Sequence, residues 1–201
     1  MTGEGKGQLL YETIGSCFDR VVAANQDRPA IVVRHQDRRA TWAEFHADVE
    51  NLAVGLLAIG IEPGDRVGIW GPNSYEWVLT QLATAKIGAI MVCLNPAYRL
   101  VELEYALGKV DCKAIITAEK FKSSDYLALL NELLPEIAQA EPGALESPRL
   151  PCLRTVIRMG EGVTPGMLNF DAVCSLGGET ERRQLARPAH PKVPRSATSI
   201  F

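Results

Sequence analysis

The sequence predicts an α/β fold in which a mostly parallel sheet is flanked by helices. Short apolar segments at residues 66–70, 89–94 and 113–117 alternate with segments of helical periodicity. The intervening segments are long enough to hold a helix, which a right-handed crossover between parallel strands requires. With 201 residues, the chain is long enough to bury one domain core.

The region before these strands is expected to form a helix, a hairpin and a second helix. Residues 13–25 carry apolar side chains at helical spacing. Residues 30–34 are a β-branched run, and residues 35–37 make the turn of a hairpin. Thr41 and Glu44 are predicted to form a capping box, because a hydroxyl and a carboxylate three residues apart can satisfy amides at a helix start.

The most informative stretch, residues 64–98, is expected to fold as one strand–helix–strand unit. Residues 71–74, Gly-Pro-Asn-Ser, bend the chain from the first strand into a helix over residues 75–87. The buried face of that helix is expected to comprise Trp77, Val78, Leu82 and Ala85. Residues 89–94 are almost continuously apolar, which predicts a strand covered on both faces.

The alternation is less regular in the C-terminal half. Helices are predicted at residues 101–110 and 168–175, and a last strand at residues 154–159. Residues 123–140 have helical character, but Pro135 interrupts them because proline cannot continue a helix.

We assign residues 9–178 to one domain and residues 179–201 to a divergent Pro-rich tail. Prolines recur at every third position from 188 to 194, among basic and small polar residues and without an apolar period. Such a segment cannot bury a core, so the tail is expected to be disordered. Within it, residues 180–186 could extend as a helix.

Composition and charge exclude several classes of function. The net charge is −3, and basic residues do not gather with aromatic ones, so we expect no nucleic-acid partner. No apolar run approaches the ~20 residues that a membrane-spanning helix needs, so no transmembrane segment is expected. Residues 1–7 resemble neither a signal peptide nor a transit peptide, which favours a cytoplasmic location if the chain is complete as given.

The five cysteines favour core positions over a metal or redox site. They are Cys17, Cys93, Cys112, Cys152 and Cys174, widely spaced and without a Cys-x-x-Cys pair. Four of them have apolar neighbours in expected helices or strands, as small buried hydrophobic residues do. No metal ligand is therefore expected among them.

No motif for catalysis or phosphate binding is present. Gly68-Ile-Trp-Gly71 and Gly177-Gly178 match neither Gly-x-Gly-x-x-Gly nor the Walker A spacing, and there is no Gly-x-Ser-x-Gly elbow. Close strand packing followed by a bend explains the first segment better than a phosphate cradle. We therefore predict no catalytic, cofactor-binding or metal-binding residue in this sequence.

Most polar and aromatic side chains have a structural explanation. Solvated surface positions are expected for the three histidines, His35, His46 and His190. Core or bend positions are expected for Trp42, Trp70, Trp77 and Tyr98. Acidic pairs such as Glu102 and Glu104 point to different helix faces, so they form no acid–base pair without other partners. Arg99 follows a strand at the carboxyl edge of the sheet, where ligands gather, so a phosphate contact is weighed there against a plain exposed arginine.

Several segments carry a family resemblance. They lie at residues 40–45, 60–67, 71–78, 102–107 and 142–151. Residues 85–98, Ala-Lys-Ile-Gly-Ala-Ile-Met-Val-Cys-Leu-Asn-Pro-Ala-Tyr, join them as a longer motif. As a set, these residues resemble the N-terminal portion of the adenylate-forming (AMP-binding) acyl-CoA synthetases, and are most similar to the medium-chain fatty acid–CoA ligases among them. The resemblance implies the N-terminal subdomain of the adenylate-forming ligase fold over residues 9–178.

The resemblance also implies a two-step reaction. ATP and a medium-chain fatty acid give an acyl-adenylate and pyrophosphate, and CoA then displaces AMP to give the thioester. The family uses ATP, Mg²⁺ and CoA, and the similar ligases are mitochondrial, in the matrix.

Several parts of the family pattern have no counterpart in this sequence. They include the adenine and ribose contacts, the acyl pocket and the small C-terminal domain whose lysine assists adenylation in the family. The family's phosphate loop, of the Thr-Ser-Gly-Thr-Thr-Gly type, has no match in residues 179–201. We therefore expect a truncated ligase to which none of these cofactors binds productively, because phosphate transfer depends on such preorganised donors. The alternative is a non-catalytic binding or regulatory module that associates with itself or with a full-length ligase.

Overall fold

A five-stranded parallel sheet forms the centre of the computed structural model, which describes residues 12–186. Its strands are β3 (Arg66–Trp70), β4 (Ile90–Leu94), β5 (Ala114–Thr117), β8 (Thr155–Arg158) and β9 (Leu168–Asn169). They lie in the order β4-β3-β5-β8-β9, and every neighbouring pair is parallel. The expected parallel α/β fold is confirmed.

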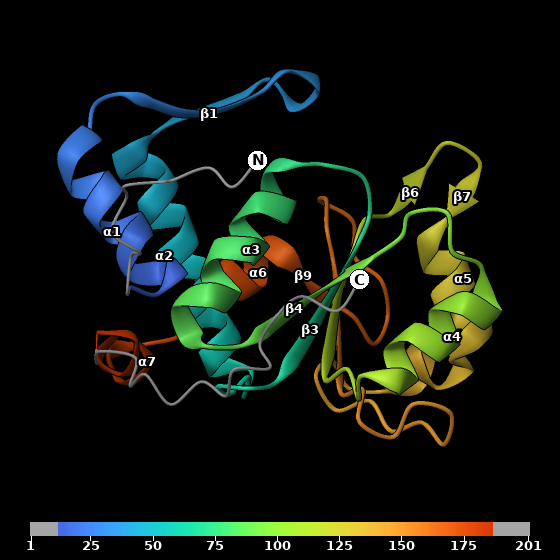
Figure 1. Cartoon of the computed structure of the whole chain (residues 1–201). Coiled ribbons are helices and arrows are strands. Elements are labelled where there is room, and N and C mark those ends of the chain that lie inside the picture. The colour runs from blue at the N-terminus through green and yellow to red at the C-terminus, as the bar shows by residue number, and fades with distance from the viewer. Residues whose placement is uncertain (1–11, 187–201) are drawn as a thin grey trace, which may run out of the picture.

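Helices cover both faces of this sheet (Figure 1). One face carries α1 (Ile14–Asn25), α2 (Trp42–Ala58), α3 (Tyr75–Ile87) and α6 (Phe170–Ser175). The other carries α4 (Leu100–Lys109) and α5 (Tyr126–Leu133). Because side chains alternate along a strand, the sheet separates two apolar cores. Val67 and Ile69 of β3 enter the first core, and Trp70 enters the second.

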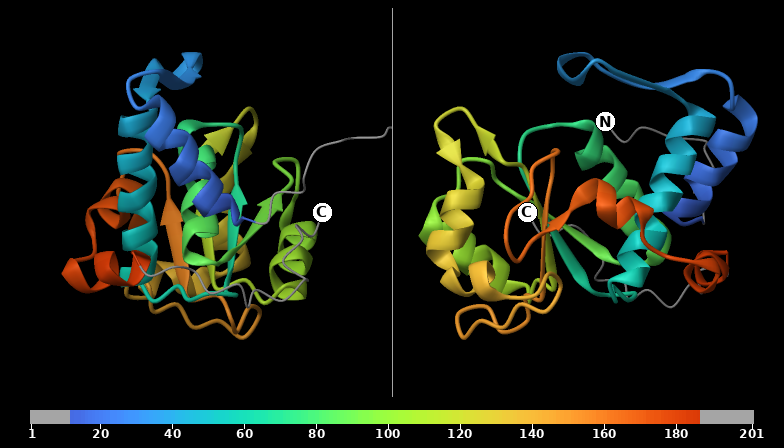
Figure 2. Two further views of the ribbon diagram at one scale, coloured as in Figure 1. Left: turned by 60° about the vertical axis from the view of Figure 1, so that its left-hand side comes forward. Right: turned by 180° about the vertical axis from the view of Figure 1, so that it is seen from behind.

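Smaller elements connect and extend these layers. They are β1 (Pro29–Val33), η1 (Arg34–Gln36), β2 (Arg38–Thr41), β6 (Lys120–Phe121), β7 (Ser124–Asp125), η2 (Pro135–Gln139) and α7 (Glu179–Leu185). The β1–β2 hairpin extends from the ends of α1 and α2 across the start of α3 (Figure 2), where its turn contacts the first residues of that helix. The expected break at Pro135 is the junction between α5 and η2.

The predicted start signal of the second helix is present in the structure. The Thr41 hydroxyl accepts from the Glu44 amide at 3.3 Å, and the Glu44 carboxylate accepts from the Thr41 amide at 2.8 Å. This capping box begins α2, whose buried side chains include Phe45 and Leu52.

The buried face of α3 differs from the expected one. Its buried residues are Tyr75, Leu79, Thr80, Ala83, Thr84 and Ile87. The four expected there, Trp77, Val78, Leu82 and Ala85, are only half-buried. The reason is that α3 packs against α1 and α2 as well as against β3 and β4, so apolar spacing marks no single face. Thr80 and Thr84 fit this interior because each hydroxyl donates to a carbonyl four residues earlier, at 2.7 Å.

Two expectations about strands are also corrected. Residues Ile90–Leu94 do form a strand, but it lies at the edge of the sheet with Cys93 exposed, so the expectation of cover on both faces is wrong. Leu168 and Asn169, expected as the start of a helix, instead pair with β8 as a short parallel strand. The helix begins only after them, where the Asn169 side chain accepts from the amides of the first turn.

Residues Glu179–Leu185 form helix α7, which agrees with the helical extension considered for residues 180–186 and corrects the expectation that disorder begins at residue 179. The Glu181 carboxylate accepts from the Gly178 amide at 2.7 Å, and Arg183 pairs with Glu179 at 2.9 Å. Leu185 packs against the core on the α1–α3 side of the sheet. This single apolar contact attaches α7 to the domain, although the helix has no apolar periodicity. Residues 187–201, with the rest of the predicted tail and His190, lie outside the described part of the chain.

None of the helices between residues 12 and 186 combines the length and apolar character needed to cross a membrane.

Candidate functional site

A crevice lies at the carboxyl ends of β3, β5 and β8. The sheet changes its winding direction here, because β4 flanks β3 on one side and β5 flanks it on the other. Ligands of open α/β sheets bind at such a switch point. A cavity of about 250 Å³ opens there, lined by His35, Gln36, Pro72, Ser74, Glu76, Ala118, Glu119, Met159 and Gly160.

Close backbone packing forms the base of this crevice. The Ala118 amide donates to the Trp70 carbonyl at 2.9 Å, which joins the loops after β3 and β5. A Cβ atom on Gly71 would lie 2.9 Å from the Ala118 Cβ, so glycine is what lets the two loops approach. This geometry supports the interpretation of the Gly68–Gly71 segment as strand packing and a bend.

Backbone amides at the start of α3 donate hydrogen bonds to side chains of the protein itself. The Tyr75 amide donates to Gln36 Oε1 at 2.7 Å, and the Trp77 amide donates to Ser74 Oγ at 3.2 Å. Gln36 also donates to Glu76 Oε2 at 2.9 Å, which ties the hairpin turn to the helix. A phosphate cradle needs several free, converging amides, and these contacts occupy two of those at this helix start.

The charges of the crevice do not fit a polyphosphate. Glu76 and Glu119 both present carboxylates to the cavity. Arg158, almost fully buried at the end of β8, pairs with Glu119 at 2.9 Å and donates to Thr164 Oγ1 at 3.2 Å. Its positive charge is therefore already compensated, and the remaining carboxylate would repel an anionic ligand. The charged residues of this crevice therefore do not fit the triphosphate of ATP.

Arg99 lies one strand away from this crevice, at the carboxyl end of β4 and the start of α4. Its side chain is exposed, and its amide donates to Glu102 Oε2 at 3.1 Å, which begins the helix. The plain reading of an exposed arginine thus fits the structure, and the phosphate contact at Arg99 stays a prediction.

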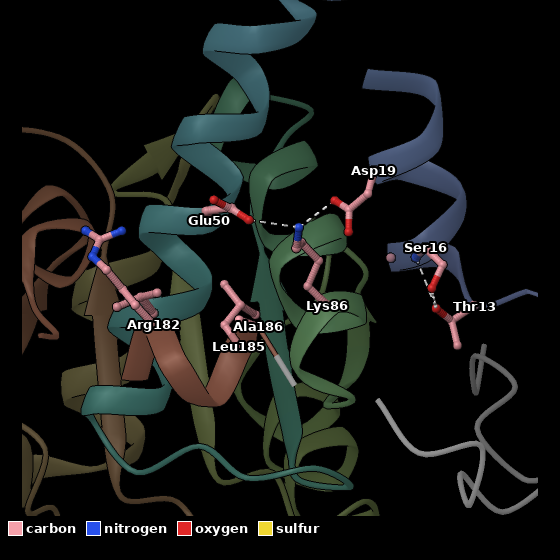
Figure 3. A pocket seen from close by; sticks show the side chains of 10 residues that line it. Thr13, Ser16, Asp19, Glu50, Lys86, Arg182, Leu185 and Ala186 are labelled. Atoms are coloured by element: carbon pink, nitrogen blue, oxygen red, sulfur yellow. Dashed lines mark hydrogen bonds and ion pairs between the residues drawn. The ribbon is translucent and has the colours of Figure 1, made fainter. Parts of the chain in front are cut away.

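A charged cluster joins α1, α2 and α3 (Figure 3). Lys86, whose side chain is 7% exposed, places its Nζ 2.6 Å from Asp19 Oδ1 and 3.2 Å from Glu50 Oε1. His46 lies 3.0 Å from the same Asp19 oxygen and stacks on Phe18 with ring centroids 5.6 Å apart. The expected solvated position of His46 is therefore wrong, whereas His35 is exposed as expected.

The surroundings of the Lys86 cluster favour a structural role. A cavity of about 350 Å³ beside it is closed on the other side by Arg182 and Leu185 of α7. The charged groups come from three helices, and Asp19 and Lys86 are 67 residues apart in the sequence. The cluster could therefore not be predicted from local sequence patterns. The two carboxylates of the protein already compensate the charge of the Lys86 ammonium. The lysine is therefore not available to bind an anionic ligand.

Replacing Lys86 by methionine is expected to lower the free energy of unfolding by about 1–3 kcal/mol, because two carboxylates lose their common partner. The cost stays moderate, since both carboxylates are partly exposed and can be hydrated. Urea unfolding measures it. Lys120→Met, at an exposed position of β6, is the matched control and should change stability by less than about 0.5 kcal/mol. Equal losses in both variants would contradict a buried role for Lys86.

The cysteines lie in less uniform places than expected. Of the five, only Cys112 is buried; Cys17 and Cys174 are half-buried, and Cys93 and Cys152 are exposed. Burial raises the pKa of both Cys112 and Cys174 to about 12, so neither is a thiolate nucleophile at neutral pH. Between residues 12 and 186, no three His, Cys, Asp or Glu side chains converge on a site that could hold a metal ion.

Sequence comparison connects this geometry to known proteins. The family model described as "AMP-binding enzyme" matches residues 18–191. Medium-chain acyl-CoA ligase ACSF2, mitochondrial, of Bos taurus is 46% identical over 182 residues, which is 90% of this chain and 29% of the relative. The Homo sapiens protein of the same name is 47% identical over 172 residues, 86% of this chain and 28% of the relative. The chain thus spans less than a third of the length of these curated relatives.

Solved structures agree on the fold. Acetoacetyl-CoA synthetase from Streptomyces lividans matches with a TM-score of 0.67 and 26% identity, over 83% of this chain and 25% of that one. The anthranilate CoA ligase AuaEII, in complex with anthranoyl-AMP, matches with a TM-score of 0.69 at 23% identity, over 84% of this chain and 29% of that one. The second likeness shows the fold alone.

Proposed function

The chain belongs to the AMP-binding enzyme family, and we propose that it is the N-terminal part of a medium-chain fatty acyl-CoA ligase. The observation that carries this is the 46% identity to a mitochondrial medium-chain acyl-CoA ligase across 90% of the chain. The reaction proposed for the whole ligase joins a medium-chain fatty acid to CoA, with ATP converted to AMP and pyrophosphate. The mitochondrial matrix is the proposed location, since the ligases it resembles are mitochondrial.

We further propose that these 201 residues do not form the acyl-adenylate by themselves. Nothing in the sequence matches a glycine-rich phosphate loop. The crevice at the sheet edge presents Glu76 and Glu119, and its arginine is already paired. Adenylation needs preorganised donors and Mg²⁺ around the triphosphate, and these residues supply neither.

ATP–pyrophosphate exchange with octanoate tests this proposal. The purified chain is expected to show no exchange above the rate without enzyme, whereas a full-length medium-chain ligase in the same assay gives the positive control. Measurable octanoate-dependent exchange by the 201-residue chain would overturn the inactive reading. The family assignment would survive that result.

A second candidate is a non-catalytic module that binds a full-length ligase. The observation that favours it is the exposure of large apolar side chains on α4, Val101 and Tyr105. Co-purification of the chain with a full-length medium-chain ligase checks it, with Tyr105→Lys as the variant that should release the pair.

A further inference from the structure

Strand β4 has one open edge. Within residues 12–186 it pairs only with β3, in an unbroken register from Arg66↔Ile90 to Trp70↔Leu94. The Ile90 amide donates toward the β3 side, to Asp65. Because backbone groups alternate along a strand, the amides and carbonyls of Met91 and Cys93 point to the open side.

The sequence of this edge strand contains nothing that hinders pairing with another strand. β4 is five residues long and reads Ile-Met-Val-Cys-Leu, without charge, proline or bulge. The opposite edge strand, β9, is only two residues long and contains Asn169. The β9 edge is therefore poorly suited to pair with another strand, whereas the β4 edge is well suited to it.

Helix α4 adds an apolar stripe beside the open edge. Its inner face buries Leu103 and Leu107 in the core. A second face exposes Val101 and Tyr105, which are 78% and 69% exposed. With β4, this face forms a groove of about 390 Å³, lined by Val92, Cys93, Leu94, Tyr98, Val101, Glu102, Tyr105, Ala106, Lys109 and Val110. The α4 residues of the groove follow helical spacing, so they form one continuous surface.

We propose that a second copy of this chain covers this surface. A twofold axis perpendicular to the sheet, passing just outside the open edge of β4 at the level of its middle residue, pairs β4 with its copy antiparallel. The two sheets then form one continuous sheet, with Met91 and Cys93 of both copies supplying the new backbone hydrogen bonds. The same axis sets the two α4 helices antiparallel on one face, where Val101 and Tyr105 of each copy become buried. A twofold interface closes on itself and therefore stops at two copies.

Charge complementarity favours this occupant over an unrelated apolar partner. The groove carries one acidic and one basic residue, Glu102 and Lys109. They lie equally far from the midpoint of the stripe, between Tyr105 and Ala106. When α4 meets its own copy antiparallel about that midpoint, Glu102 of each copy faces Lys109 of the other. The surface is thus self-complementary, as an isologous interface requires.

Sedimentation velocity of the full chain over a range of concentrations tests the proposal. The chain is expected to sediment as a dimer. Lys109→Glu alone and Glu102→Lys alone should each weaken the dimer by about tenfold, because like charges then meet twice across the axis. Mixing the two variants should give a heterodimer about as stable as the wild-type dimer, since every facing pair is again opposite in charge.

Two further variants keep the test decisive. Glu102 also accepts from the Arg99 amide, so its replacement weakens the start of α4. Tyr105→Lys, at an exposed position, avoids this and should weaken the dimer at least as strongly. Glu132→Lys, at an exposed position on α5, is the matched control and should leave it unchanged. A monomer at all concentrations, a dimer indifferent to Tyr105→Lys, or no recovery on mixing would each overturn the proposal.

Discussion

Replacing Trp70 by alanine is expected to lower the free energy of unfolding by about 3–5 kcal/mol. The indole is fully buried at the end of β3, and its centroid lies 4.3 Å from that of the Tyr126 ring. Its Nε1 donates to the Asn95 carbonyl at 3.1 Å. The substitution therefore opens a large cavity and removes one of the two donors to the Asn95 carbonyl, which keeps the Tyr98 amide at 3.0 Å. A loss of this size removes a large fraction of the stability of an ordinary domain, which is about 5–15 kcal/mol.

Urea unfolding followed by far-ultraviolet circular dichroism measures the effect without relying on the deleted fluorophore. Trp77→Ala is the matched control, because Trp77 lies on α3 and is only half-buried. It should cost less than half as much as Trp70→Ala. Trp70→Phe should cost less than Trp70→Ala, since it keeps part of the ring packing although it removes the hydrogen bond and the rest of the indole. Equal losses at Trp70 and Trp77 would contradict the observed difference in burial.

The contrast between these tryptophans shows how far the sequence could predict the fold. The alternation of strands and helices between residues 66 and 117, the capping box at Thr41 and the bend after Trp70 follow from local chemistry, and all three are present. The buried face of α3 does not follow from it. Periodicity identifies a face only when a helix packs on one side, and α3 packs on two. Two of its core residues are threonines, whose hydroxyls are satisfied inside the helix itself.

The features around the candidate site could not be predicted either, because they too arise from contacts between elements that are distant in the sequence. The switch point between β3 and β5 follows from strand order, which no local pattern specifies. The partners of Lys86 come from two other helices, so no spacing within α3 reveals them. Arg158 has the sequence context of an ordinary charged residue near the end of a strand, and only the fold places its guanidinium against Gly160 and Gly162.

Replacing Gly55 by alanine is expected to destabilise the chain by about 2–3 kcal/mol, although alanine is the better helix former by about 1 kcal/mol. Gly55 lies inside α2 where that helix crosses α6. A Cβ atom there would fall 1.9 Å from the Val173 carbonyl oxygen and 2.7 Å from the carbonyl carbon. Both atoms belong to the backbone of α6, so relief requires the two helices to separate.

Gly108→Ala should change stability in the opposite direction. Gly108 also lies inside a helix, α4, but its added Cβ would meet only the Leu150 Cδ2, at an ordinary 3.5 Å. No steric clash then opposes the gain in helix propensity, so this variant should be neutral or more stable by up to about 1 kcal/mol. Chemical denaturation of both variants measures the difference. Two helical glycines that the sequence does not distinguish would thus give effects of opposite sign, and a stabilising Gly55→Ala would show that α2 and α6 are not in contact there.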